Sequence, residues 1–561
     1  MNSVKLKAYP SSDMVLLAFD WYDGKSRADF LGFAIKRKPG FKGESESWLP
    51  NRLTFSGAAH IDAISGKMEV CTSNKFPIQK FMWWDAHFNS GDKKKNYAYT
   101  VYAVSGTPEN LILEEESKET ILVTLADQNS VPIKTFFNRA VVSSQSFSNK
   151  FIKDGKFDEN KLEDALEWLS NGLGEVIPDF LKSAERVDGA IYHLKDKKWI
   201  IPALKKFRNP LSLVYHNHLN DTSNEDAIIS LRENENIEFW PRTRTSIMHN
   251  KFLVVSEKNN GPQKILMGSA NFTTEGLTEQ ANLYHIFESP QLAALYLERK
   301  TLLEKDPSKS QTQKSNGWSE SVQIGKAAAR VYFFPEKSPG RLGLDPIINA
   351  IKNAKQSVLF CIFSPTDAIL REALFNSGDE GKMMFGLVNY ISDEEPVEKS
   401  GAADVKAKIE IYHRNRNNKD VYDHHSFSKA NVPPGFWWEL NSIPKKIKSK
   451  IPPVYIHHKF ILIDAETENP VIYTGSANMS NNSNYNNDEN LIEITNAPEI
   501  GKIYLAEFMR LYEHYRARVA FSKNNAANGK KILKLDSTAG WSKEYYISGN
   551  PKYKSRIAMA N

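Results

Sequence analysis

Two short motifs decide how this chain folds, because each of them occurs twice in the same order. The first motif reads IMHNKFLVVS at residues 247–256 and YIHHKFILID at residues 455–464. The second reads MGSANF at residues 267–272 and TGSANM at residues 474–479. The interval from His249 to Gly268 is nearly the same as the interval from His457 to Gly475. This agreement indicates an internal duplication.

The spacing within each copy predicts which side chains share a face. Positions i and i+2 of a strand point the same way and lie about 6.5 Å apart, so His249 should lie beside Lys251, and His457 beside Lys459. The apolar runs after each lysine predict strands that are buried on both faces. Gly-Ser-Ala-Asn then ends the next strand in a turn that brings a hydroxyl, an amide and backbone N–H groups to the same edge.

Two such copies facing each other supply two imidazoles and two ammonium groups around one pocket. Phosphodiester cleavage without a metal needs this set, because one neutral imidazole attacks phosphorus and the other protonates the leaving oxygen. Cations and neutral donors stabilise the charge on the phosphoryl oxygens. Histidine suits both roles because its ordinary pKa of about 6.5 allows one copy to be neutral and the other charged.

The pattern His-x-Lys-x4-Asp followed by Gly-Ser-x-Asn, twice in one chain, resembles the phospholipase D superfamily over about residues 135 to 561. The second copy matches the family at every position, and the first copy carries Ser256 where the family has aspartate. The resemblance implies two phospholipase D-like α/β halves with pseudo-twofold symmetry, with the motif strands side by side at their interface. It also implies a metal-independent phosphodiesterase that acts through a phosphohistidine and needs no cofactor.

The resemblance also implies the roles of individual residues. His249 is expected to be the nucleophile and His457 the general acid, although the reverse order stays open. An acidic residue downstream orients each histidine in the family, and Glu279 and Glu489 follow His249 and His457 at similar intervals along the chain. The expected catalytic residues are His249, Lys251, Asn271, Glu279, His457, Lys459, Asp464, Asn478 and Glu489, with Ser269 and Ser476 binding phosphate.

The serine that departs from the family pattern yields a separate prediction. Ser256 follows four apolar strand residues, so alternation places it on the face opposite Lys251. We expect it to have a structural role without contacting phosphate, so that replacement by alanine costs stability more than rate.

The rest of the chain predicts a β-sandwich at residues 1–130, a first α/β half at 131–315 and a second at 316–561. Short β-type runs separated by turn residues fill the N-terminal part. Apolar residues at helical spacing predict one long helix from Leu162 to Phe180, and a β-type run predicts a strand from Ala407 to Tyr412. The polar stretch at residues 309–316 is typical of an interdomain linker.

Two other classes of function compete with this interpretation. A metal-dependent phosphodiesterase or nuclease could take ligands from His216 and His218 and from the segment Asp423-His424-His425, but carboxylate partners at ligand spacing are not evident. A non-catalytic module could use the paired motifs only to bind a phosphate. The presence of histidine and lysine in both copies argues against such a module.

The composition permits an anionic partner without requiring one, since 73 Lys and Arg stand against 67 Asp and Glu in 561 residues. Two cysteines far apart give no disulfide framework and favour a reducing compartment. No apolar stretch reaches the roughly 20 residues needed to span a bilayer. A cytoplasmic location is therefore expected, although export without a cleavable signal would leave the same sequence.

The segment before the second histidine bears on the substrate. It reads VPPGFWW at residues 432–438 and is followed by four lysines between residues 445 and 450. Core packing, a lipid-interface anchor and a stacking platform for single-stranded bases all fit this composition. Both motifs in one chain are typical of the family's phospholipases and phospholipid synthases, so cleavage of phospholipid head groups with peripheral membrane contact is expected. A nuclease acting on DNA or RNA is the alternative. Hydrolysis or transfer to an alcohol, the partner of the β-domain and the oligomeric state stay open.

Overall fold

A computed structural model provides the structure of this chain. It describes most of the 561 residues, and every structural statement below concerns these residues alone. The described ranges are 2–51, 53–57, 71–88, 95–128, 130–140, 150–153, 156–219, 221–313, 317–391, 403–423, 455–527 and 534–561.

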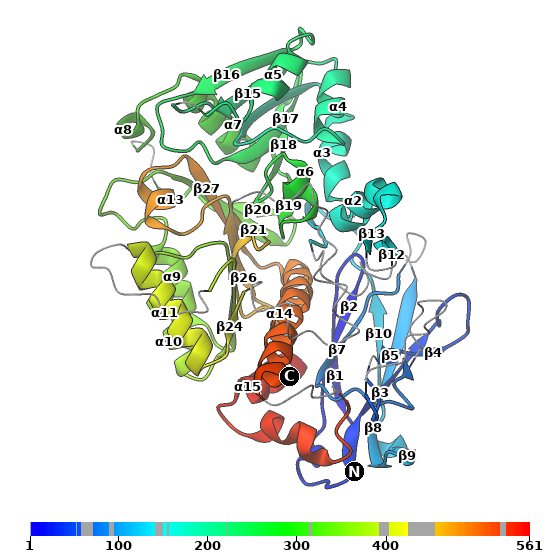
Figure 1. Ribbon diagram of the computed structural model, residues 1–561. Helices are drawn as coiled ribbons and strands as arrows, with labels where there is room; N and C mark the ends of the chain where they lie inside the picture. Colours follow the sequence, from blue (N-terminus) through cyan, green and yellow to red (C-terminus); the bar gives the residue numbers. More distant parts are fainter. Residues whose placement is uncertain are drawn as a thin grey trace.

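The N-terminal part consists of antiparallel β-sheets (Figure 1). One sheet has the order β1 (Lys5–Pro10), β2 (Val15–Asp20) and β7 (Met82–Asp85). The other has the order β10 (Glu119–Thr124), β8 (Asn96–Thr107), β3 (Phe30–Lys38) and β4 (Ser47–Trp48), with β9 (Asn110–Leu113) paired to β8. Apolar side chains of both sheets share one core, in which the rings of Phe19 and Phe33 lie 4.5 Å apart.

The first mixed sheet follows, and we call it with its helices the first α/β unit. Its strand order is β11 (Ile133–Phe137), β19 (Leu283–Glu288), β18 (Gly261–Gly268), β17 (Lys251–Glu257), β14 (Arg186–Ile191), β15 (Leu211–His216) and β16 (Ile237–Arg242). Its helices are α2 (Leu162–Ser170), α3 (Leu173–Leu181), α4 (Ile200–Lys206), α5 (Glu225–Leu231), α6 (Thr274–Thr278) and α7 (Pro290–Glu304). The strand that follows His249, β17, is central and fully buried up to Ser256, as its apolar run predicts.

The second mixed sheet repeats much of this order, and we call it with its helices the second α/β unit. Its strand order is β20 (Val322–Ile324), β21 (Ala327–Phe334), β27 (Glu489–Thr495), β26 (Val471–Gly475), β25 (Lys459–Ile463), β22 (Ser357–Ile362), β23 (Met383–Val388) and β24 (Val421–Tyr422). Its shorter helices are α9 (Asp345–Asn353), α10 (Ala368–Asp379), α11 (Ala403–Asn417) and α13 (Asn481–Tyr485). The strand that follows His457, β25, is again central and completely buried.

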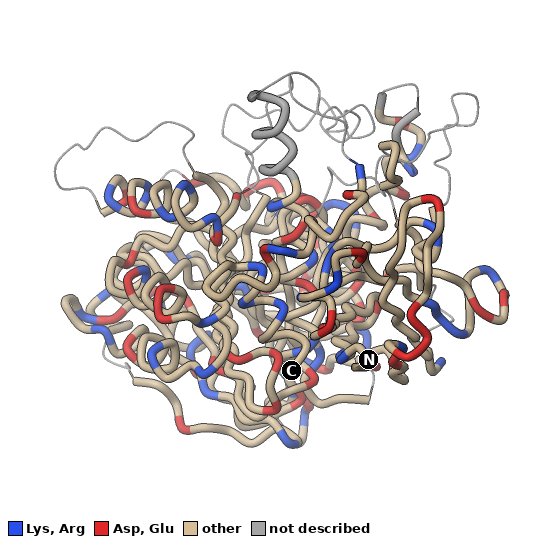
Figure 2. Tube along the Cα trace, turned by 90° about the horizontal axis from the view of Figure 1, so that it is seen from below, with Lys and Arg blue, Asp and Glu red and all other residues tan. Residues whose placement is uncertain are grey.

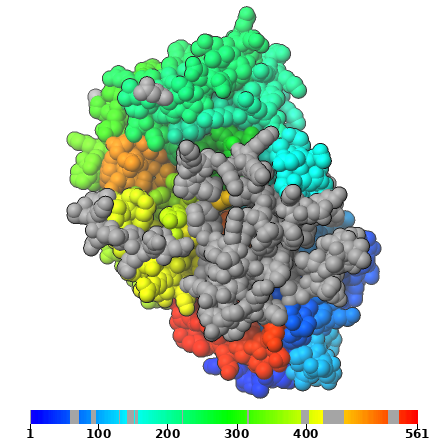
Figure 3. Space-filling model, viewed as in Figure 1, coloured from blue at the N-terminus to red at the C-terminus, as the bar shows by residue number. Residues whose placement is uncertain are grey.

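Helix α14 (Pro498–Ala527) joins the three parts. It contacts β1 of the N-terminal sheets, β11 of the first unit and β25 of the second. The chain then returns to the N-terminal sheets, where η9 (Ala539–Tyr546) and α15 (Pro551–Ala560) pack on them (Figure 3). Trp541 and Tyr545 pack around Phe81, and Arg556 pairs with Asp20. Residues from the end of the chain thus complete the core of the N-terminal sheets.

The structure corrects three expectations about secondary structure. The predicted long helix is two helices, α2 and α3, because Asn171 and Gly172 have φ angles of 52° and 87° and end the first one. The predicted strand at residues 407–412 lies inside helix α11, whose buried residues Ala407, Ile411 and Arg414 recur at helical spacing. Part of the predicted linker forms the short helix α8 (Lys309–Thr312) with a capping box.

Charged residues of both signs are interspersed along the described trace (Figure 2). No helix in the described part of the chain is both long and apolar enough to cross a bilayer.

Candidate active site

The two motif histidines lie where the two α/β units meet. Each follows a residue that forms a short parallel bridge to the other unit, Met248 with Asp488 and Ile456 with Ala281. The backbone N–H of His249 donates to the carbonyl of Asp488 at 2.9 Å. The backbone N–H of His457 donates to the carbonyl of Ala281 at 3.2 Å. The main chains before β17 and β25 are therefore held by the opposite unit, which brings both histidines to one interface.

The His249 side chain is bound by the second unit. Its Nδ1 lies 2.7 Å from Oε2 of Glu489 and 3.1 Å from the carbonyl oxygen of Ser476. The other carboxylate oxygen of Glu489 accepts from the Ser483 hydroxyl at 3.0 Å and from the Asn487 amide. Both acceptors at Nδ1 favour a proton there, which leaves Nε2 of His249 as the free nitrogen.

The His457 side chain is bound by the first unit through an amide. Its Nδ1 lies 2.9 Å from Oδ1 of Asn282. Asn282 is completely buried and fixed in orientation, because its Nδ2 donates to the carbonyl of Gly276 and its Oδ1 accepts from the Ser269 hydroxyl. Nδ1 of His457 is therefore the donor in this contact, and its Nε2 is also left for a substrate.

The expectation that Glu279 orients a histidine has to be corrected. Glu279 lies at the C-terminal cap of α6, and within the described residues it makes no hydrogen bond to either histidine. The register of the strands gives the reason, since Gly268 pairs with Tyr284 just as Gly475 pairs with Leu491. Asn282 and Glu489 thus hold matching positions, because each lies two residues before the strand partner of a motif glycine.

The sequence contains a signal for this match. Asn282 follows Gly268 at the same interval at which Glu489 follows Gly475. The prediction of Glu279 instead uses the interval from each histidine and considers only acidic residues, so it passes over the neutral Asn282. The two copies therefore differ at this position, with a carboxylate on His249 and a neutral amide on His457.

Both motif lysines are fully buried beside their own histidines. Nζ of Lys251 donates to the carbonyl of His249 at 2.5 Å, and Nζ of Lys459 donates to the carbonyl of His457 at 2.6 Å. Burial lowers the pKa of Lys251 to about 7, although Glu489 opposes the shift, and burial together with Lys251 lowers the pKa of Lys459. A bound anion would reverse these shifts, so the two ammonium groups suit a phosphoryl group.

The same charges act on the histidines and on Glu489. Burial and the two lysines lower the pKa of both His249 and His457 well below the ordinary value. Burial raises the pKa of Glu489 to about 7, and Lys251 works against this. His249 is consequently neutral near neutral pH, as a nucleophile must be.

The Gly-Ser-Ala-Asn motifs end β18 and β26 beside the neighbouring strands. A Cβ at Gly268 would collide with the carbonyl of Leu283, and one at Gly475 with the carbonyl of Asn490, which explains the glycines. The serine hydroxyls of Ser269 and Ser476 accept from the backbone N–H groups of those same neighbours. Both serines are thus engaged in fixing the strand ends.

The asparagines of these motifs differ from the serines. Oδ1 of Asn271 and Oδ1 of Asn478 are buried, and neither oxygen accepts a hydrogen bond within the described residues. Unpaired buried amide oxygens are rare in native structures, so these two oxygens are available to accept hydrogen bonds from a ligand or water.

Aromatic residues missed by the sequence analysis flank each histidine-lysine pair. The ring of Tyr192 lies 5.0 Å from the His249 ring and 5.1 Å from Nζ of Lys251. The ring of Phe363 lies 5.8 Å from the His457 ring and 5.5 Å from Nζ of Lys459. His193 stacks on Tyr192 at 3.7 Å, and its buried Nε2 has no partner among the described residues. The side facing His249 is therefore the more polar of the two.

Asp464 lies away from these groups, at the far end of β25. Its carboxylate accepts hydrogen bonds from three consecutive backbone N–H groups, those of Lys355, Gln356 and Ser357. These bonds assign it a structural position and not the catalytic one expected from the motif. Ser256 lies at the corresponding end of β17, where its buried hydroxyl makes no hydrogen bond within the described residues. The expected stability cost of replacing Ser256 by alanine therefore has no hydrogen bond to support it.

Two of the histidines considered as metal ligands for a metal-dependent phosphodiesterase, His216 and His218, contact the protein backbone. Nδ1 of His216 accepts from the backbone N–H of Met248, and Nδ1 of His218 lies 2.8 Å from the carbonyl of Thr243. In the described ranges, no group of three or more His, Cys, Asp or Glu could hold a metal ion. His424, His425 and the segment at residues 432–450 lie outside the described residues.

Comparison with known proteins identifies one segment directly. Residues 347–512 match the family model described as "Cardiolipin synthase, PLD-like domain", where PLD denotes phospholipase D. No curated protein sequence matches the chain significantly.

Solved structures resemble the chain at low sequence identity. Phosphatidylserine synthase of Haemophilus influenzae is 13% identical over 70% of this chain and 94% of its own, with a TM-score of 0.40. A yeast tyrosyl-DNA phosphodiesterase is 12% identical over 59% of this chain and 87% of its own, with a TM-score of 0.31. Polyphosphate kinase of Porphyromonas gingivalis is 11% identical, with a TM-score of 0.33. The match covers 58% of this chain but only 42% of the length of that protein.

Residues 347–512 of this chain therefore form a phospholipase D-like domain.

Proposed function

We propose that this protein is a metal-independent phosphodiester hydrolase that forms a phosphohistidine at His249. The observation that carries the assignment is the unequal pair of contacts, Glu489 at Nδ1 of His249 and Asn282 at Nδ1 of His457. A carboxylate stabilises the positive charge that an imidazole gains when it attacks phosphorus, and an amide does so far less. A neutral partner leaves His457 free to lose and regain a proton, as a general acid and base must.

The proposed reaction has two steps. Nε2 of His249 forms a bond to phosphorus while the bond from phosphorus to the leaving oxygen breaks, and His457 gives that oxygen its proton. His457 then takes a proton from water as the water oxygen attacks phosphorus, and the bond from phosphorus to His249 breaks. The ammonium groups of Lys251 and Lys459 and the side-chain amide nitrogens of Asn271 and Asn478 donate to the phosphoryl oxygens in both steps. The anionic substrate raises the depressed pKa values of His457 and the two lysines on binding.

We also propose that the two α/β units are related by a pseudo-twofold axis. The matching bridges Met248–Asp488 and Ala281–Ile456, and the matching lysine-to-carbonyl bonds, support this relation.

The proposed mechanism is tested with a phosphodiester that has a good leaving group, such as bis(p-nitrophenyl) phosphate. His457→Ala should release one equivalent of nitrophenol and accumulate a phosphorylated His249, because departure of nitrophenolate needs no acid while hydrolysis needs the base. His249→Ala should give neither product nor label, and a chelator should change nothing in the unmodified protein. Label on His457, or substantial turnover by both single variants, would overturn the assignment.

For the substrate we propose phospholipid head groups. The matched family model carries the description of cardiolipin synthase, which supports a lipid, as does the presence of two motifs in one chain. A nuclease is the second candidate, and the stacked Tyr192–His193 pair beside His249 favours it because planar bases stack on such rings. The decisive assay compares phospholipid vesicles with single- and double-stranded nucleic acid under one set of conditions. Cleavage of nucleic acid with no action on vesicles would exclude the lipid proposal.

A further inference from the structure

Asp488 of the second α/β unit bridges to Met248 of the first, the residue directly before His249. It directly precedes Glu489, and its side chain is completely buried. Its backbone N–H donates to the carbonyl of Ile247 at 2.9 Å, and its carbonyl accepts from the N–H of His249 at 2.9 Å. One residue of the second unit thus fixes the main chain on both sides of Met248. The side chain that contacts the His249 imidazole belongs to the next residue.

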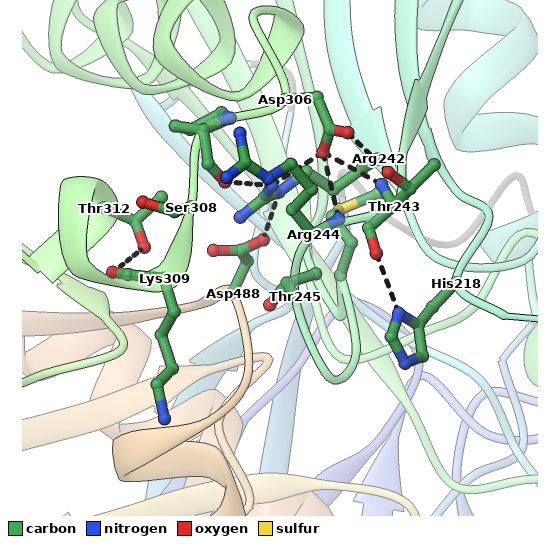
Figure 4. Close-up of polar contacts among 12 residues, drawn as sticks. His218, Arg242, Thr243, Arg244, Thr245, Asp306, Ser308, Lys309, Thr312 and Asp488 are labelled. Carbon is green, nitrogen blue, oxygen red and sulfur yellow. Dashed lines mark hydrogen bonds and ion pairs between the residues drawn. The ribbon is translucent and has the colours of Figure 1, made fainter.

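Two arginines of the first unit hold the Asp488 carboxylate. Nε of Arg242, the last residue of β16, lies 2.8 Å from Oδ2, and Nη2 of Arg299, in α7, lies 3.4 Å from Oδ1. Both arginines are buried, with exposed side-chain fractions of 0% and 2%. Each is anchored again within its surroundings, Arg242 by Asp306 and the carbonyl of Pro307 (Figure 4), and Arg299 by the carbonyl of Phe334. The carboxylate is therefore held by groups that are themselves fixed.

Among the described residues, the position beside His457 that corresponds to Asp488 is Ala281, and it has no ion pair. Ala281 bridges to Ile456 with backbone hydrogen bonds alone, because its side chain is a methyl group. The next residue, Asn282, is fixed only by neutral hydrogen bonds, including one from its N–H to Oδ1 of Asn138 at 2.9 Å. Among the described residues, the ionic arrangement is thus confined to the side of the interface where a carboxylate meets a histidine.

Burying the charges of Asp488, Arg242 and Arg299 costs desolvation free energy. A buried ion pair often contributes little net stability, because desolvation offsets the attraction. Here one carboxylate faces two guanidinium groups, and Nη2 of Arg242 and Nε of Arg299 have no hydrogen-bond partner among the described residues. Asp306 balances the second guanidinium charge, but an arrangement that leaves buried guanidinium N–H groups without hydrogen bonds in the described part of the chain is poorly explained by stability alone. The ion pairs do hold Asp488, and with it the main chain that leads into β27 at Glu489.

We propose that Asp488, clamped between Arg242 and Arg299, is a positioning residue that sets the contact between Glu489 and His249. This inference rests on the proposed function, in which His249 is the nucleophile. Asp488 does not touch the substrate and acts only through the main chain of His249 and the adjacent carboxylate. The ion pairs of Asp488 fix the position of Glu489 against the His249 imidazole. Beside His457 the contacts of Asn282 are neutral hydrogen bonds, which allow this imidazole to shift as it gives up and regains its proton in the two steps.

The main test uses Asp488→Asn, which keeps the shape and removes the charge. Glu493→Gln is the matched control, since Glu493 also pairs with an arginine, Arg330, at 2.7 Å but lies farther along the strand that begins at Glu489. Phosphohistidine formation is followed in a rapid-mixing burst with bis(p-nitrophenyl) phosphate. We expect Asp488→Asn to slow formation on the order of 10²-fold with KM within about twofold, and to shift the pH profile of that step. Glu493→Gln should stay within about threefold of the unmodified protein and keep its pH profile.

Asp488→Asn leaves the buried Arg299 without the carboxylate it pairs with and Arg242 with Asp306 alone, so the variant can fail to fold. The double variant Asp488→Asn/Arg299→Met removes one of these charges and provides a second test of the same step. A folded Asp488→Asn or double variant that forms phosphohistidine at the unmodified rate, with an unchanged pH profile, overturns the proposal. So does an equal slowing in Glu493→Gln.

A substrate-free measurement separates this proposal from the proposed function. Diethyl pyrocarbonate acylates neutral imidazole nitrogens, and peptide mass spectrometry gives the rates at His249 and His457 separately. Asp488→Asn should change the His249 rate by more than about threefold and leave the His457 rate alone; equal rates for His249 in both proteins count against the clamp. If the unmodified protein cleaves no phosphodiester, the proposed function fails while this labelling result still decides the role of Asp488.

Discussion

Nδ1 of His249 lies 2.7 Å from Oε2 of Glu489, although the two residues are 240 positions apart and belong to different α/β units. The contact joins the units at the point where chemistry is proposed. Its counterpart beside His457 is an amide, so the pair of histidines is chemically unequal before any substrate binds. Substitutions at these partners, and at the residues around them, should therefore affect the two histidines differently.

Glu489→Gln should slow phosphohistidine formation by about 10²- to 10⁴-fold, because the imidazole loses both its charged partner and its preferred tautomer. The pKa of Glu489 is raised to about 7 by burial, so the unmodified protein should show a titration near pH 7 in this step. The variant should lack it. Rapid-mixing rates between pH 5 and 9 provide the measurement, and a pH profile that keeps this titration in the variant would assign it to another group.

Asn282→Asp should place a carboxylate at Nδ1 of His457 and raise the pKa of that imidazole. The alkaline limb of the rate profile should then move upward by about one pH unit. Asn282→Leu serves as the control, since it removes the hydrogen bond without adding charge and should not move the limb upward. Identical alkaline limbs in Asn282→Asp and the unmodified protein would mean that His457 is not the group titrating there.

Tyr192→Phe should raise KM a few-fold with kcat nearly unchanged, because it removes a hydroxyl beside the His249–Lys251 pair while keeping the ring over Lys251. Tyr192→Ala removes the ring as well and should lower kcat. Phe363→Tyr is the reciprocal change on the other side. Steady-state kinetics of the three variants decide whether the ring or the hydroxyl contributes, and unchanged kinetics in Tyr192→Ala would mean that Tyr192 does not contact the substrate.

Glu279→Gln should keep activity within about twofold, since among the described residues Glu279 makes no hydrogen bond to either histidine. Its pKa is raised to about 7 by burial, with Glu275 acting in the same direction. The folded state therefore binds more protons than the unfolded state between the ordinary pKa near 4.5 and about 7, and stability falls as pH rises through this window. In urea unfolding, the free energy of unfolding of the variant relative to that of the unmodified protein should therefore rise from pH 5 to pH 8. A constant difference in the free energy of unfolding over that range would contradict the raised pKa.

Asp464→Asn should lower stability by about 1–3 kcal/mol while kcat stays the same, because one amide oxygen cannot replace a carboxylate that accepts three backbone N–H groups. Thermal or urea unfolding together with steady-state kinetics tests this. A large loss of kcat at unchanged stability would restore Asp464 to the catalytic residues.

Much of the central architecture follows from local sequence patterns. The apolar runs after Lys251 and Lys459 predict buried strands, and β17 and β25 are buried and central. Periodicity fails where it has to distinguish short elements. Asn171 and Gly172 end a helix that the apolar pattern alone continues, and the charged segment at 407–412 is helical because its buried face recurs at the helical period.

The sequence by itself determined the chemical identity of the site, because His249, Lys251, His457 and Lys459 carry their meaning in local i and i+2 spacing. Only the tertiary structure decided which group faces each imidazole. Glu489 contacts Nδ1 of His249 in the other unit, Asn282 contacts Nδ1 of His457 in place of the expected Glu279, and Asp488 links the His249 side to buried arginines. These contacts join residues far apart in the chain across an interface, and no local pattern encodes a partner that another strand brings into place.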